Sequence, residues 1–132
     1  MTTEDKINRA TRSLAEGEIG RARRLIEQVL TEEPDNLKGL WLAASIQESR
    51  GEVESWLETL NKLKELLPRE LYVVEELSRA YSKVNRLGDA LKLLSEYLRV
   101  APDSATARYN YAHYLARAGD YNESVAQYEK VL

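Results

Sequence analysis

Two kinds of reactive side chain are scarce in this chain of 132 residues, which has no cysteine and one histidine, His113. Without cysteine there is no disulfide framework, no thiolate metal site and no cysteine nucleophile. One histidine also excludes a metal site with two histidine ligands within a single chain. We therefore expect no enzyme activity, no cofactor and no bound metal.

Basic tracts and long apolar runs are also missing. The 19 Lys and Arg residues interleave with 22 Asp and Glu residues, a pattern that argues against nucleic acid or an anionic membrane as the partner. No segment approaches the ~18 apolar residues of a membrane span, and the first residues do not resemble a signal peptide. These absences predict a cytoplasmic protein, and a hydrophobic content of 43% predicts that it folds.

Proline occurs only three times, at Pro34, Pro68 and Pro102, and both intervals are 34 residues. Because proline lacks a backbone N–H and disfavours helix in the residue before it, each should end a helix. Asn36 and Ser104 follow two of these prolines and are suited to cap the next helix. The surroundings of Pro68 fit this pattern less well.

Between the prolines, apolar residues recur at steps of three and four, which is typical of amphipathic helices. Residues that favour the left-handed conformation ending a helix occur about halfway through each 34-residue period. These breaks are Gly17, Gly51, Asn85 with Gly88, and Gly119. Each period is therefore predicted to hold two helices joined by a tight turn, about eight helices in the whole chain. Such pairs bury their apolar faces only by stacking on one another, as in a solenoid.

The period and several residue columns resemble the tetratricopeptide repeat family. With the proline taken as position 32, the repeats are 3–36, 37–70, 71–104 and 105–132. Position 8 holds the small residues Ala10, Ala44, Ser78 and Ala112. Position 20, which faces it, holds Ala22, Trp56, Ala90 and Ser124. The resemblance implies an all-α, right-handed superhelix of antiparallel helix pairs that forms a single domain over residues 1–132.

Three places depart from the family pattern. In the first helix the apolar residues Ile7, Ala10 and Leu14 lie on a rotated stripe, which predicts an N-terminal cap. Trp56 replaces a small residue, so either its repeat opens or the indole escapes to the edge. Because Leu132 is followed by no polar helix that would cover the last apolar stripe, we expect a fragment of a longer protein.

The resemblance also implies that positions 2, 5, 9, 12 and 13 line a concave groove. Trp41, Tyr72 and Tyr109 fall on these columns, where they either form a peptide platform or fill a tight superhelix. The aromatics on packing columns are expected in the core, namely Tyr81, Tyr97, Tyr111, Tyr121 and Tyr128.

Cations gather on the groove columns of the later repeats. Arg79, Lys83, His113 and Arg117 lie there, with Asn110 adjacent to them. They are suited to bind carboxylates of a peptide, and the alternative is pairing within a helix, as between Glu75 and Arg79. The residues that family members use to clamp the C-terminal carboxylate of heat-shock chaperones match poorly here, which disfavours a cochaperone role.

The leading hypothesis is a scaffold that binds a peptide or a partner protein of unknown identity in the concave groove. A second is an accessory domain of a larger enzyme, because bacterial sulfotransferases and glycosyltransferases often carry such arrays. Residues 101–112 loosely resemble the N-terminal arrays of the sulfotransferases. A third is a homo-oligomer that associates through the uncovered C-terminal face.

Overall fold

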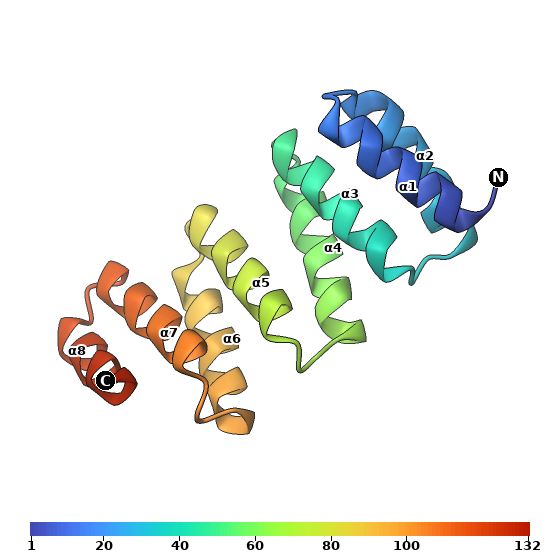
Figure 1. Cartoon of the computed structure of the whole chain (residues 1–132). Coiled ribbons are helices and arrows are strands. Elements are labelled where there is room, and N and C mark those ends of the chain that lie inside the picture. The colour runs from blue at the N-terminus through green and yellow to red at the C-terminus, as the bar shows by residue number, and fades with distance from the viewer. The chain divides into compact units, whose positions relative to one another are not determined.

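A computed structural model describes all residues, 1–132, as eight α-helices without strands (Figure 1). The first helices of the four pairs are α1 Thr3–Ala15, α3 Leu37–Ser49, α5 Leu71–Lys83 and α7 Ala105–Arg117. The second helices are α2 Ile19–Glu32, α4 Val53–Leu66, α6 Leu87–Val100 and α8 Tyr121–Val131. Each set begins at intervals of 34 residues, so the all-helical prediction and the two helices per period are confirmed. None of the eight helices combines the length and the hydrophobicity that a membrane-spanning helix needs.

The turn inside each pair contains one residue in the left-handed region. Three are glycines, Gly17, Gly51 and Gly119, with φ of 79°, 71° and 91°, and the fourth is Asn85 with φ of 63°. Glycine has no Cβ to clash in this region, and asparagine tolerates it better than most other residues. The predicted breaks at Gly17, Gly51, Asn85 and Gly119 are therefore confirmed, whereas Gly88 lies inside α6 and does not end a helix.

Between pairs, the helices end two residues before each proline. The residues predicted to cap the next helix do so after Pro34 and Pro102. The side-chain oxygen of Asn36 accepts a hydrogen bond of 2.8 Å from the Gly39 amide. Ser104 Oγ accepts one of 3.2 Å from the Ala107 amide. After Pro68 the N-cap residue Glu70 makes no side-chain capping bond. The sequence around Pro68, which fits the repeat pattern less well, therefore also lacks the side-chain cap that follows the other two prolines.

The eight helices divide into two compact units, Met1–Leu66 and Leu67–Leu132. In the first unit α1 packs on α2, α2 on α3 and α3 on α4, and α1 also contacts α3. The second unit repeats this order, because α5, α6, α7 and α8 pack successively and α5 also contacts α7. A single continuous superhelix over both units stays a prediction.

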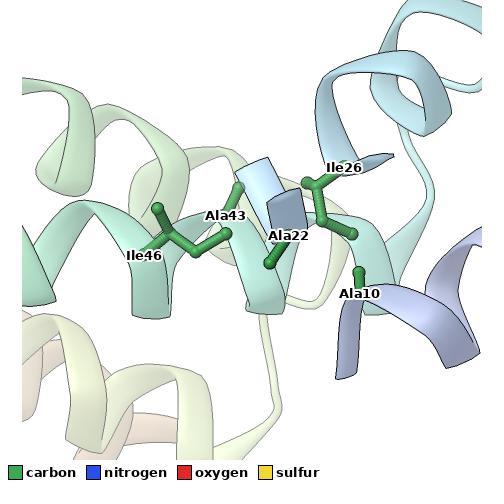
Figure 2. Packing of buried hydrophobic residues seen from close by; sticks show 5 residues of the cluster. All are labelled: Ala10, Ala22, Ile26, Ala43 and Ile46. Atoms are coloured by element: carbon green, nitrogen blue, oxygen red, sulfur yellow. The ribbon is translucent and has the colours of Figure 1, made fainter. Parts of the chain in front are cut away.

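The core of the first unit is built from small and branched side chains of three helices. Figure 2 shows this cluster, which consists of Ala10 from α1, Ala22 and Ile26 from α2, and Ala43 and Ile46 from α3. The rotated stripe predicted for α1 is the buried face, since Ile7 and Ala10 are buried and Leu14 packs against the cluster. Ser13 is buried on the same face, which the sequence did not indicate.

Trp56 is only 3% exposed on α4, so of the two alternatives the escape of its indole to an edge does not occur. The residue opposite it in the repeat pattern, Ala44, is also buried at 3% exposure. The first unit therefore accommodates a large aromatic where the other three pairs have Ala or Ser.

Candidate functional site

The predicted binding residues gather on the first helices of the second unit. Three lie on α5 and four on α7, which are Tyr72, Arg79, Lys83, Tyr109, Asn110, His113 and Arg117. We call this set the α5–α7 face. Within each helix most of these residues are separated by about one or two helical turns, a spacing that places side chains along one side of a helix. Because α5 and α7 are in contact, the structure brings these two rows into one unit.

Two tyrosines are the exposed apolar part of the α5–α7 face. Tyr72 is 45% exposed on the first turn of α5, and Tyr109 is 54% exposed on α7. The Tyr109 ring packs edge-on against Tyr128 of α8, with ring centroids 5.4 Å apart and an interplanar angle of 65°. This contact holds the Tyr109 ring in place while leaving half of its surface accessible.

Arg79 is held by an acidic residue one turn before it. Its Nη2 and Nε atoms donate hydrogen bonds of 2.8 Å and 3.3 Å to the two carboxylate oxygens of Glu76. Pairing within the helix thus exists, and Glu76, three residues before Arg79, takes part in it. The pair is substantially exposed, so its charges remain accessible to water.

Arg117 connects the two helices of the face. Its guanidinium on α7 donates a hydrogen bond to Ser82 Oγ on α5, a hydroxyl that belongs to a buried residue. His113 is exposed one turn before Arg117, and its ring packs edge-on against Tyr114 with centroids 5.3 Å apart. Lys83 is exposed at the end of α5. The α5–α7 face therefore carries basic residues on more than one turn of the two helices.

Sequence reasoning missed Tyr114, which lies beneath the face and is 9% exposed. Burial raises the pKa of its phenol above the ordinary value, while the neighbouring Ser78 hydroxyl of α5 and the nearby Arg117 oppose that rise. Ser78 is fully buried and carries no bulk beyond its hydroxyl, so it leaves room for the ring. The only signal in the sequence was the small residue at position 78, on the column of close helix contacts.

The remaining predicted site residue, Trp41, belongs to the first unit. It lies on α3, and its side chain is half-buried rather than exposed. The structure therefore places seven of the eight predicted residues on the contacting helices α5 and α7, and Trp41 on α3 of the first unit.

Tyr121 was expected in the core and is instead 69% exposed, so that prediction is wrong. The reason is its place at the start of α8, where no further helix packs on its outer side. Val125, one turn later, is 55% exposed, and Leu132 is fully exposed. The second half of the chain thus has an apolar strip along α8 as well as the α5–α7 face.

No group of three or more His, Asp or Glu side chains is arranged to hold a metal ion. A small hollow of about 100 Å³ lies between α2 and α3, lined by Arg23, Ile26 and Gln47 among others. In its lining, Arg23 Nε and Gln47 Oε1 are buried without a hydrogen-bond partner. A larger hollow lies between α1 and α2 and is described below.

Comparison with known proteins agrees with this architecture. Residues 76–132 match the family model described as tetratricopeptide repeat. No curated protein matches the chain. The tetratricopeptide repeat family is therefore supported by sequence in the second half of the chain.

Solved structures extend the fold to nearly all residues. A MamA RS-1 double mutant superposes with a TM-score of 0.80 at 15% identity, over 98% of this chain and 72% of that protein. A tetratricopeptide repeat protein of Thermus thermophilus has a TM-score of 0.69 at 25% identity, over 99% and 73%. YrrB, described as a tetratricopeptide repeat protein with an unusual peptide-binding site, has a TM-score of 0.75 at 17% identity, over 96% and 65%. The chain thus has the all-helical fold of these proteins, two of which are described as tetratricopeptide repeat proteins.

Proposed function

We propose that this chain, which is similar to tetratricopeptide repeat proteins, is a scaffold that binds a peptide segment of a partner protein. The observation that carries the proposal is the pair of exposed tyrosines, Tyr72 and Tyr109, on the contacting helices α5 and α7. The peptide lies along the α5–α7 face. The description of YrrB as a protein with a peptide-binding site supports the same class of function.

Tyrosine suits this role because its ring offers a large contact area and loses little side-chain freedom on binding. Tyr109 should lose little of this freedom, since its ring already packs against Tyr128 before any ligand binds. Rings held in their bound orientation lower the ordering cost of association. Tyr109 is therefore the expected anchor of the site, and Tyr72 the second aromatic contact.

The charged residues define the kind of peptide. Lys83, His113 and Arg117 favour a segment that carries Asp or Glu beside apolar residues. Arg117 is already oriented by its bond to Ser82, and its remaining N–H groups are able to pair with a carboxylate. Asn110 is half-buried next to Tyr109, and its amide has both a donor and an acceptor for a peptide group. Trp41 of the first unit is a separate candidate binding residue, which we propose independently of this face.

Peptides selected from a random phage-displayed library against the whole chain provide the ligand for a test. We expect substitution of Tyr72 and Tyr109 by alanine together to weaken the selected peptides at least about tenfold, since hot-spot aromatics contribute about 2 kcal/mol or more. Tyr121→Ala is the matched control, because it removes a tyrosine that is more exposed but lies off the face. Trp41→Ala, measured separately, tests the contribution of the first unit.

Binding is measured by fluorescence polarisation, and circular dichroism establishes that each variant is folded. Equal affinities for the wild type, the double variant and the control would contradict the site assignment. Loss in Tyr121→Ala with retention in the double variant would place the site on α8 instead.

Self-association is a second candidate, favoured by the exposed apolar residues Tyr121, Val125 and Leu132 of the α8 end. The accessory-domain hypothesis, with a bacterial sulfotransferase or glycosyltransferase as the larger enzyme, stays a prediction. Location in the cytoplasm and the absence of nucleic-acid and membrane partners likewise stay predictions.

A further inference from the structure

A hollow of about 380 Å³ lies between α1 and α2 in the first unit, and half of its lining residues are arginines. The four are Arg9, Arg12, Arg21 and Arg24. The lining contains one acidic residue, Glu16. The hollow shares no residue with the α5–α7 face, so any ligand that it holds is recognised independently of the peptide.

The local sequence explains why four guanidinium groups meet here. Arg9 and Arg12 are three residues apart on α1, and Arg21 and Arg24 are three apart on α2, so each pair lies on one side of its helix. The turn at Gly17 returns the chain, and α2 packs against α1. Two short arginine rows from neighbouring helices therefore border the same hollow.

Two of these arginines, Arg12 and Arg24, have no acidic partner within the chain, whereas Arg9 interacts electrostatically with Asp5. Arg21 makes one ion pair of 3.1 Å with Glu18, and both side chains are exposed, so this pairing is weak. No hydrogen bond or ion pair within the chain engages the guanidinium groups of Arg12 and Arg24. Elsewhere arginines have acidic partners, as Arg23 has Glu52 and Arg86 has Asp89. The hollow thus concentrates positive charge in a protein whose net charge is −3.

We propose that this hollow binds a phosphate monoester, either a phosphorylated serine or threonine of a partner protein or a small organic phosphate. A phosphate monoester carries a charge of about −1.5 to −2 and three strongly accepting oxygens. Guanidinium groups match these oxygens with two parallel hydrogen bonds each. Arg12 and Arg24 are the principal ligands, because neither is engaged elsewhere, and Arg9 and Arg21 supply the surrounding positive potential.

The dimensions and surroundings of the site favour one compact anion over a long polyanion. A nucleic acid strand or an anionic membrane needs basic residues repeated along a surface. Here Glu4, Asp5 and Glu18 lie on or beside the same two helices and interrupt any extension of the basic patch. The four arginines are confined to a single helix pair, which suits a single phosphorylated group.

The test uses the whole chain at low ionic strength and isothermal titration calorimetry. The probes are a capped Ala-phosphoserine-Ala tripeptide, the same peptide with unmodified serine, and inorganic phosphate. We expect saturable 1:1 binding of the phosphopeptide and none of the unmodified peptide. Affinity should fall as salt is added, because charge pairing dominates the interaction.

Substitution of Arg12 and Arg24 by glutamine should weaken phosphopeptide binding at least about tenfold, since hydrogen bonds to charged groups contribute strongly. Arg50→Gln with Arg99→Gln is the control, because it removes the same charge from two exposed arginines outside the hollow. The control pair should stay within about twofold of the wild type.

The outcomes separate the two sources of phosphate. Phosphopeptide binding tighter than that of inorganic phosphate supports a phosphorylated partner, and equal affinities support a small phosphate compound. No saturation by either probe, or equal affinity of the Arg12/Arg24 variant and its control, would overturn the proposal. Binding of phosphatidylserine vesicles without binding of the phosphopeptide would also overturn it.

Discussion

Ser124 on α8 donates a hydrogen bond of 2.7 Å through its hydroxyl to the backbone carbonyl of Ala112 on α7. Both residues are buried, with exposures of 3% and 0%. A side chain bonds directly to the backbone of a neighbouring helix only where the two helices approach closely. The two positions are those at which the repeat pattern places small residues, so this contact explains why both residues are small in the fourth pair.

Replacement of Ser124 tests this close approach. Ser124→Ala removes one buried hydrogen bond and should lower the free energy of unfolding by about 1 kcal/mol. Ser124→Leu forces extra volume against α7 and should cost more, about 1–3 kcal/mol beyond the alanine variant. Urea denaturation of the two variants checks the order. A leucine variant as stable as the alanine variant would mean that the helices have room to separate.

Much of the fold was predictable because the sequence repeats every 34 residues, so that equivalent positions of the four repeats make the same kind of contact. The prolines, the turn glycines and the small residues of columns 8 and 20 each predicted a feature that the structure contains. Trp56 and Tyr121 were not predictable in this way. The first is buried through packing that its column does not describe, and the second is exposed because no further helix packs on it, which only three-dimensional contacts reveal.

The candidate site was predictable only in part. Repeat positions placed Tyr72 and Tyr109 on first helices, and both are exposed there. Residue spacing does not determine whether Arg79 pairs with an acidic residue three or four positions away. It also does not determine that Tyr114 is buried, because both features depend on the direction of the side chain. The arginine hollow was also missed, because its two rows lie on different helices and look like ordinary solvated residues in the sequence.

Trp56→Ala should be among the more damaging substitutions in the first unit. The indole is 3% exposed, so its removal leaves a large cavity, and loss of a buried tryptophan typically costs about 3–5 kcal/mol. Trp41→Ala is the comparison, because Trp41 is half-buried and its loss should cost less. The urea midpoints of the two variants, followed by circular dichroism, measure the difference. Equal midpoints would contradict the burial assigned to Trp56.

Gly119→Ala isolates the backbone cost of a turn. Gly119 has φ of 91°, and a Cβ built on it meets no heavy atom within 4 Å. The destabilisation should therefore come from the backbone alone, about 1–2 kcal/mol. Gly20→Ala is the control, since Gly20 also has open space for a Cβ but lies inside α2 without a positive φ. There alanine should stabilise the helix by about 0.5–1 kcal/mol.

The raised pKa of Tyr114 predicts a loss of stability at high pH. Burial favours the protonated phenol in the folded chain, whereas the unfolded chain releases this proton near pH 10, the ordinary value. Above that pH the folded state binds more protons than the unfolded state, so stability falls as pH rises toward the folded pKa. Below it the contribution is fully present. Tyr114→Phe removes the ionisation and keeps the ring.

Urea unfolding at pH 8 to 11 compares the wild type with Tyr114→Phe, which shares all the other titrating groups. At pH 8 the phenol is largely protonated in the folded and the unfolded chain, so the stability difference between the two proteins at that pH is the reference. Above pH 10 the wild type should lose stability relative to Tyr114→Phe. A difference that stays constant up to pH 11 would mean that burial of Tyr114 does not perturb its ionisation.

Self-association through α8 makes a separate prediction. Tyr121 and Val125 are 69% and 55% exposed one turn apart, and Leu132 extends the strip at the end of the helix. Two copies that meet through these strips would bury apolar surface that is otherwise in water, which favours dimers at high concentration. Val125→Glu places a charge in such an interface and should abolish association, whereas Lys92→Glu, at an exposed position of α6, should not. Sedimentation equilibrium over a dilution series measures the mass, and a monomer at every concentration of the wild type would exclude the dimer.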